Sequence, residues 1–281
     1  MPTSYPIRLK YHRLRMEKFV YEKGTNVALY NAEHTQEYKD AQDSIQKGIK
    51  VQLSLFDADK IHHLMLFTKS AAPPPDALVQ AIAVTFGVDT LDAYINMDEY
   101  LQIAGTWGGQ AAMDKMQING VFTLQNQELL TYLSDHANLV IDSVDQTTQK
   151  WLADQIMQGS ADGLTPQEIA NGIADSSDQF SEARAKTIVL TETAAAITQV
   201  EIATSASYGI TEKTWHTSED DLVDEICGDL DDETVGINES FSSGDDGPPA
   251  HPNCRCYIDY PTPDFFNTDT AAADTTDIPA E

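Results

Sequence analysis

Residues 163–168, Gly-Leu-Thr-Pro-Gln-Glu, contain the strongest local signal for the fold of this chain. The hydroxyl of Thr165 can accept hydrogen bonds from the first free amides of a helix, and Pro166 fits the first helical turn because its missing N–H would have no partner there. Glu168 then completes a capping box. The sequence therefore predicts that a helix begins at Thr165.

The sequence on either side of this signal also favours helices. From Asn126 to Gly159 one face stays apolar, which predicts a long helix with at most one break. After residues 176–178, Ser-Ser-Asp, we expect a new helix that begins near Ser181 and runs to about Ser207. The glycines of residues 105–109 predict a turn between two shorter helices.

The periodicity changes towards the C-terminus. Residues 213–217 and 256–260 alternate between apolar and polar side chains, which predicts two short strands, and residues 218–225 between them predict an acidic loop or short helical turn. The expected fold class is mainly α, with a helical body and a small C-terminal α+β module. Residues 261–281 are rich in Asp, Thr, Ala and Pro, and we expect a disordered acidic tail there.

These patterns suggest four segments. A chain of 281 residues exceeds the usual size of a single core. Residues 73–75 are three prolines, which interrupt any helix and indicate a boundary. We expect an N-terminal segment over residues 1–72 with a basic start, a helical body over residues 76–208, the Cys/His module over residues 209–260 and the tail from residue 261.

Charge is distributed unevenly along the chain. The net charge is −28, yet residues 1–70 carry 11 Lys and Arg against 8 Asp and Glu. The larger, acidic part of the chain should repel nucleic acid. The first residues instead interleave bases with apolar side chains, so they either contact a negative surface or form an ordinary amphipathic segment; the basic residues are Arg8, Lys10, Arg13, Arg15 and Lys18.

The sequence has no apolar run long enough to span a membrane, and its first residues lack the apolar stretch of a secretory signal. With 3 cysteines in 281 residues the chain is not a disulfide scaffold, and we expect it to be made in a reducing cytoplasm.

The cysteines and one histidine form the candidate metal site. His251, Cys254 and Cys256 lie within six residues, and Cys227 can return to them through a loop. These four side chains are the donors of a closed structural zinc site, and Asp224 is a weaker alternative ligand. The other interpretation is that the thiols stay reduced, or that Cys227 forms a disulfide, while His251 bonds to the backbone. The sequence has no nucleophile elbow or His-Glu-x-x-His motif, so we expect no enzymatic activity.

A second group of polar residues lies on the predicted helix before the module. Arg184 and Lys186 are the only basic residues between Lys150 and Lys213. Arg184 is expected either to bind a carboxylate or helix carbonyls, with Glu192 two turns further along the same face, or to belong to a solvated helix face.

The order of these features resembles the phage Mu F-like head morphogenesis family of minor capsid proteins. The resemblance covers roughly residues 120–260. It rests on a helix with Arg184, Thr187, Thr191-Glu192-Thr193 and Ala196, then on Trp215, Thr217 and Asp220, and then on Leu230-Asp231 and Phe241. Its most specific part is the run Pro248-Pro249-Ala250-His251-Pro252-Asn253-Cys254-Arg255-Cys256.

The sequence departs from the family pattern at two positions. Leu190 stands where the family usually has an arginine, and Asp224 stands where it usually has the first cysteine of a Cys-x-x-Cys pair. The second departure weakens one donor of the candidate zinc site and favours a metal-free module.

The resemblance implies a low-copy structural protein inside the virion head or at the portal vertex, made in the host cytoplasm. Its implied partners are the portal protein and other head proteins, and its implied roles are head building and genome packaging or ejection. The alternative is a zinc-dependent nuclease or related hydrolase that uses His251 and its acidic neighbours.

Overall fold

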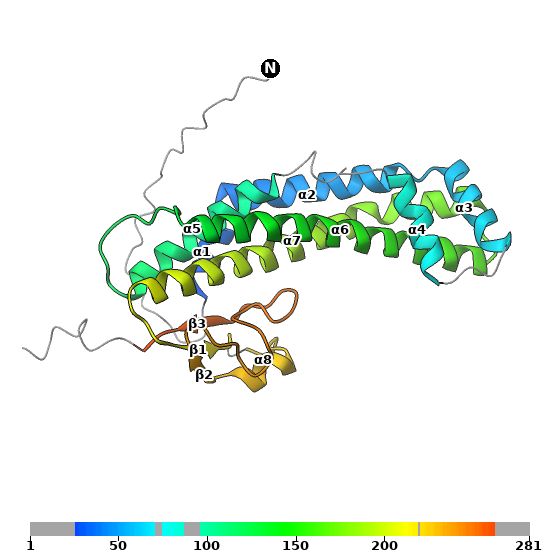
Figure 1. Cartoon of the computed structure of the whole chain (residues 1–281). Helices are drawn as coiled ribbons and strands as arrows, with labels where there is room; N and C mark the ends of the chain where they lie inside the picture. The colour runs from blue at the N-terminus through cyan, green and yellow to red at the C-terminus, as the bar shows by residue number, and fades with distance from the viewer. Residues whose placement is uncertain (1–25, 71–74, 87–95, 219, 262–281) are drawn as a thin grey trace, which may run out of the picture.

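The computed structural model describes residues 26–70, 75–86, 96–218 and 220–261. Within these residues, seven helices precede a small sheet, and four of them, α2, α5, α6 and α7, run side by side as an elongated bundle (Figure 1). Helices α3 and α4 lie at one end of the bundle and the module lies at the other. The helices are α1 (Val27–Glu33), α2 (Gln36–Ser54), α3 (Ala58–Ser70), α4 (Pro75–Phe86), α5 (Met97–Lys115), α6 (Gln127–Ala161) and α7 (Pro166–Ser207).

Helix α7 is the centre of this arrangement. It has 42 residues and contacts α1, α2, α3, α5 and α6. One continuous apolar core joins α2 to α7, from Tyr38 and Ile45 through Leu101 and Leu133 to Val200. The mainly helical fold class is thus confirmed, whereas the division into four segments stays a prediction, since the prolines of the proposed boundary lie largely outside the described residues.

Local signals placed the starts of the two longest helices correctly. The side chain of Asn126 accepts from the amides of Glu128 and Leu129 at the start of α6, which continues unbroken for 35 residues. Thr165 and Glu168 form the predicted capping box at the start of α7.

The break predicted at residues 176–178 is wrong, because α7 passes through it without interruption. The hydroxyls of Ser176 and Ser177 donate to carbonyls of the preceding turn of the same helix, so these serines do not cap a new one. Nearby, Phe180 stacks on Trp151 of α6 with ring centroids 4.3 Å apart. Tertiary packing therefore outweighs the low helix propensity of the Ser-Ser-Asp run.

The turn predicted at residues 105–109 is also wrong, because these residues lie inside α5. A Cβ atom on Gly108 would lie 2.1 Å from the carbonyl oxygen of Ile197 in α7, and one on Gly109 would lie 2.2 Å from the ring of Phe122. The glycines are thus required for the close approach of α5 to α7 and to the Phe122 side chain.

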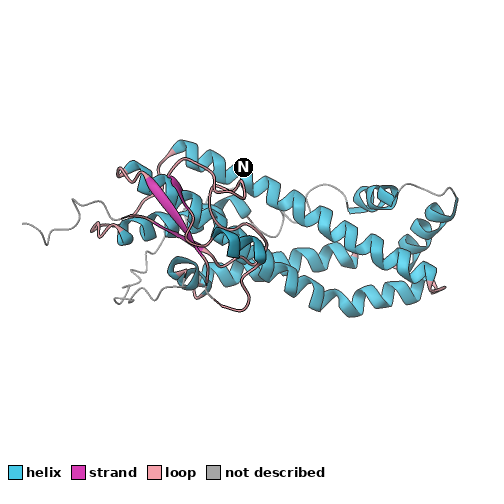
Figure 2. Cartoon of the chain, turned by 90° about the horizontal axis from the view of Figure 1, so that it is seen from below, coloured by secondary structure: helices cyan, strands magenta, loops and turns pink. Residues whose placement is uncertain are grey.

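The module contains a three-stranded antiparallel sheet and one short helix (Figure 2). The strand order is β2-β1-β3, so β1 is central. Strands β1 and β3 confirm the two predicted strands, whereas β2 had not been predicted. The elements are β1 (Glu212–His216), α8 (Glu225–Leu230), β2 (Thr234–Gly236) and β3 (Tyr257–Asp259).

None of the described helices is sufficiently long and apolar for a membrane span. The basic residues Arg8, Lys10, Arg13, Arg15 and Lys18 and nearly all of the predicted tail lie outside the described residues.

Candidate functional site: a thiol cluster beside the longest helix

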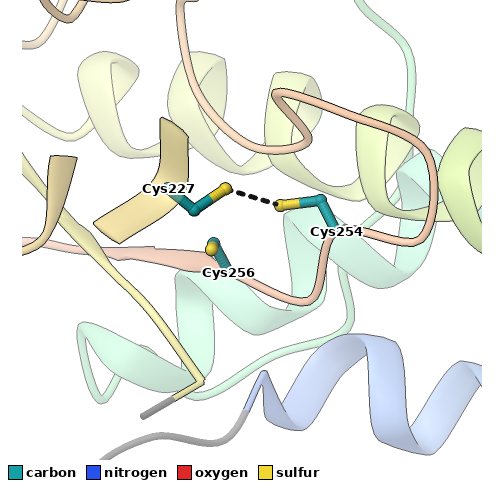
Figure 3. A group of neighbouring side chains, drawn as sticks. All are labelled: Cys227, Cys254 and Cys256. Carbon is teal, nitrogen blue, oxygen red and sulfur yellow. Dashed lines mark hydrogen bonds between the residues drawn. The ribbon is translucent and has the colours of Figure 1, made fainter. Parts of the chain in front are cut away.

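The module brings its three cysteines together in its core (Figure 3). Cys227 comes from α8, Cys254 from the loop after the cis Pro248–Pro249 bond, and Cys256 from the residue before β3. Their sulfur atoms all lie within 4.8 Å of one another, and the Sγ atoms of Cys227 and Cys254 are 3.6 Å apart. All three side chains are buried and none forms a disulfide.

The three thiols differ sharply in acidity. Hydrogen bonding from Cys256 is the main cause that lowers the pKa of Cys254 to about 5. Burial, together with the neighbouring Cys254 charge, raises the pKa of Cys227 to about 12. The pKa of Cys256 is also raised, chiefly because its thiol donates to Cys254. The contacts within the cluster thus favour the thiolate form at Cys254 over the thiolate forms of Cys227 and Cys256.

The two other predicted ligands do not join the cluster. The Nδ1 atom of His251 lies 2.9 Å from the carbonyl oxygen of Pro252. The carboxylate of Asp224 caps α8 by accepting from the amide of Ile226 at 3.1 Å. Among the described residues, the group that could hold a metal here consists of Cys227, Cys254 and Cys256.

These three residues supply three of the four ligands that structural zinc requires. Tetrahedral zinc with Zn–S bonds of about 2.3 Å places thiolate sulfurs about 3.8 Å apart. The 3.6 Å separation of Cys227 and Cys254 agrees with that geometry. The donor set thus fits zinc at three positions, and the fourth depends on a ligand that the cluster does not contain.

Trp215 packs beside the cysteines in the module core. Its side chain is fully buried on β1 and meets the ring of Phe241 edge-on, with centroids 5.2 Å apart. The core consists of seven buried residues, Trp215, Cys227, Leu230, Phe241, Cys254, Cys256 and Ile258. The thiols therefore make up much of the packing that holds this small module together.

The Thr191-Glu192-Thr193 run of α7 binds three different parts of the molecule. The Thr191 hydroxyl accepts from the amide of Asn253, in the cysteine loop, at 3.1 Å. Glu192 contacts Nε2 of His136 on α6 at 2.7 Å, and the Thr193 hydroxyl lies 2.5 Å from that of Tyr100 on α5. Successive helical residues point about 100° apart, so a run of three can reach three neighbours.

Arg184 is not tied to Glu192, which pairs with His136 instead. The Nε atom of Arg184 is buried and has no hydrogen-bond partner among the described residues. Burial lowers the pKa of its guanidinium. The expected bond from Arg184 to a carboxylate is thus absent from the part of the chain that the structure describes.

Comparison with known proteins relates part of this chain to a protein family. Residues 150–259 match the profile of a family described as phage Mu protein F like protein. Over this segment the chain is similar to that family. The match confirms the resemblance seen in the sequence and indicates a protein of phage head morphogenesis. No curated protein and no solved structure matches the chain.

The Mu F-like segment contains the C-terminal part of α6, all of α7 and the module to the end of β3. The remainder of the chain binds this segment at points that the sequence did not reveal. Asn26, which caps α1, donates from Nδ2 to the carbonyl oxygen of Cys256 at 3.0 Å. Tyr100 and His136, which contact the Thr191–Thr193 run, also lie outside the match.

Lys115, at the end of α5, makes the most extensive of these contacts. Its ammonium group forms a buried ion pair with Glu201 of α7 and donates to the carbonyl oxygen of Ile258 in β3 at 2.6 Å. It also lies 5.9 Å and 5.6 Å from the ring centroids of Tyr257 and Tyr260. Such long-range pairing leaves no periodic signal in the sequence.

Proposed function

We propose that this chain is a minor structural protein of a phage head that acts in head morphogenesis at the portal vertex and has no enzymatic activity. The observation that carries this proposal is the extent of the family match. It covers residues 150–259 and therefore includes both α7 and the module that Thr191 attaches to it. The helix and the cysteine module thus form one unit. A protein that presents a fixed surface to other head proteins needs its parts to be joined in this way.

The uneven distribution of charge along the chain supports a location of the protein close to the portal. Residues 71–281 hold 37 of the 45 acidic residues and 6 of the 17 basic ones. A surface of this sign avoids packaged DNA, because both are strongly negative. The basic start of the chain, with Arg8, Lys10, Arg13, Arg15 and Lys18, is then the part that contacts portal protein or DNA, and through it the chain assists genome packaging or ejection.

Head assembly in cells that produce the phage structural proteins tests the role. Replacing Arg13, Arg15 and Lys18 by Gln should leave the purified chain folded but reduce its incorporation into heads. The matched control replaces Lys39, Lys47 and Lys60, which lie on α2 and α3, by Gln. Incorporation reduced equally by both sets, or by neither, would contradict a portal contact through the N-terminal residues.

The competing hydrolase hypothesis is tested with His251. A structural role predicts that His251→Ala and Cys254→Ser change folding or assembly only, since no activity exists to be lost. Hydrolysis of nucleic acid by the wild-type protein with added zinc, abolished in His251→Ala, would favour the hydrolase instead.

We also propose that Cys227, Cys254 and Cys256 hold one structural zinc ion, and that the ring of His251 turns from the Pro252 carbonyl towards the cluster to become the fourth ligand. The support for this site is a buried cluster of three sulfurs in a core of seven residues, which is small for a module without a metal or disulfide. Zinc would supply bonds that apolar packing does not provide here.

Metal analysis of protein purified without chelator tests the site. One equivalent of zinc per chain and three protected thiols are expected. Because His251→Ala removes a ligand, it should weaken zinc binding by more than the roughly 10–100-fold that follows loss of a residue hydrogen-bonded to a ligand. If the native protein purified in this way contains no zinc and all three thiols titrate freely, the proposal is overturned. Loss of free thiols in pairs, reversed by a reductant, would instead indicate the disulfide.

A further inference from the structure

The module exposes an acidic and apolar stretch between Asp220 and Ile226, here called the acidic-apolar surface. Leu222 is 78% exposed and Ile226 is 52% exposed, whereas Val223 between them packs against the module core. Asp221 and Glu225 are exposed beside them. Two large apolar side chains among carboxylates are suited to a partner that is basic and apolar at once.

The described part of the module cannot neutralise this surface. Residues 209–261 include 14 Asp and Glu but only two bases, Lys213 and Arg255. Lys213 is 1% exposed and donates to the carbonyl oxygen of Ile237. Arg255 is held by Asp220 through two hydrogen bonds of 2.6 Å and 2.7 Å. Among the described residues, Asp221 and Glu225 form no ion pair.

The N-terminal residues enter the structure next to this surface. Asn26 Nδ2 donates to the carbonyl oxygen of Cys256, the neighbouring Arg255 binds Asp220, and Asp220 accepts from the amide of Leu222 at 3.0 Å. Direct contacts therefore lead from the first described residue to the acidic-apolar surface. The chain that precedes Asn26 is therefore attached within a few residues' length of the acidic-apolar surface.

The segment that precedes Asn26 has the complementary chemistry. Residues 8–19 carry five basic side chains, one acidic side chain and the apolar residues Leu9, Tyr11, Leu14, Met16 and Phe19. The seven residues from Phe19 to Asn26 can span at most about 24 Å. A short tether of this kind raises the effective local concentration to the order of millimolar, so even weak contacts would be populated.

We propose that residues 8–19 dock on the acidic-apolar surface of the same chain. Their bases face Asp221 and Glu225, and their apolar side chains cover Leu222 and Ile226. The contact is electrostatic in part, so salt weakens it, and a polyanion or an acidic partner surface competes for the same bases. The basic segment is thereby held on the module until a stronger acidic partner displaces it. This inference does not depend on the proposed role in head morphogenesis.

Limited trypsin digestion of the full-length chain tests the docking. Cleavage after Arg13 and Arg15 at low salt should be slower by about tenfold than at high salt if the effective concentration exceeds the Kd about tenfold. The triple variant Asp221→Asn, Leu222→Ser, Glu225→Gln should restore fast cleavage. The matched control, Asp135→Asn with Asp142→Asn on the exposed face of α6, should not.

Two outcomes would overturn the proposal. One is a cleavage rate that is the same in wild type, triple variant and control at low salt. The other is protection that disappears on dilution of the protein, because the segment would then occupy a second copy of the chain. Carbodiimide coupling of Lys10 or Lys18 to Asp221 or Glu225 within a monomer, mapped by mass spectrometry, should agree with the protection; coupling spread evenly over the acids of α6 would contradict it.

Discussion

The helical bundle and the module differ in what holds each of them together. The bundle has one apolar core that joins α2 to α7, whereas the module core has seven residues, three of which are cysteines. Each buried Leu or Ile contributes about 1.5–3 kcal/mol, so the bundle has ample apolar stabilisation. The module has little, and it relies on its thiol cluster and on bonds to α1, α5 and α7. The module is therefore stable largely because the bundle supports it.

The strongest test of this dependence is the Lys115→Met variant. Removing the ammonium group leaves Glu201 buried without its partner and frees the carbonyl oxygen of Ile258, so we expect a loss of about 3–5 kcal/mol in the free energy of unfolding at neutral pH. Urea titration followed by far-UV circular dichroism and by tryptophan fluorescence gives the value. The matched control is Lys186→Met, which removes an exposed pair with Glu182 and should cost less than about 0.5 kcal/mol.

The pH dependence of this variant identifies the cause. Burial raises the pKa of Glu201 above its ordinary value of 4.5, and Lys115 opposes that rise. Without Lys115 the pKa of Glu201 in the folded state rises further. As pH increases from the pKa of Glu201 in the unfolded state to its pKa in the folded state, the folded state keeps a proton that the unfolded state loses, so the free energy of unfolding falls. The cost of Lys115→Met should therefore be smaller at about pH 5 than at about pH 8. An equal cost at both would show that lost packing, and not the uncompensated charge, dominates.

The second test acts on the bundle alone. Gly108→Ala places a Cβ atom 2.1 Å from the backbone of Ile197 and must push α5 away from α7. We expect a loss of about 1–3 kcal/mol, or more if the helices cannot adjust. The control is Gly172→Ala on the exposed side of α7, where no atom lies within 4 Å, and it should stabilise the protein by about 0.4–1 kcal/mol. Equal effects of the two substitutions would contradict the close packing of α5 on α7.

Helix ends were predictable from the sequence because their signals are local. Asn126 and Thr165 cap the first turns with their own side chains, and no distant residue is needed. The two errors have one cause, since Ser176 and Gly108 were interpreted by local propensity although their conformation depends on neighbours in other helices. The continuous α7 and the tight α5–α7 contact are tertiary effects.

The candidate site was predictable only in part. The spacing of His251, Cys254 and Cys256 made a cluster with Cys227 reasonable, and the three thiols do meet. Their spacing did not reveal that His251 turns to Pro252 or that Asp224 serves as a helix cap. The contacts of Asn26 and Lys115 with the module join residues 230 and 143 positions apart, and no motif marks them.

The smallest expected effect comes from Thr191→Val. It removes the acceptor for the amide of Asn253, and because that amide is exposed, water replaces much of the bond; the expected loss is about 0.5–1 kcal/mol. Amide hydrogen exchange should be faster in residues 250–256 and unchanged in the core of the bundle. Thr131→Val on α6, whose hydroxyl donates to its own helix, is the control. Faster exchange throughout the bundle in Thr191→Val would mean that module and bundle unfold as one unit.

The three consecutive contacts of Thr191, Glu192 and Thr193 restrict how the length of α7 can change. One residue inserted upstream in this helix would rotate everything after it by about 100° relative to α2 and α6. The whole set of partners, from His136 to the cysteine loop, would then be misaligned together. Seven inserted residues would restore the rotation to within about 20°, but they would also move these three residues about 10 Å along the bundle, away from their partners. Neither insertion preserves the contacts, so the positions of His136, Tyr100 and the cysteine loop fix the number of residues in α7 before Thr191.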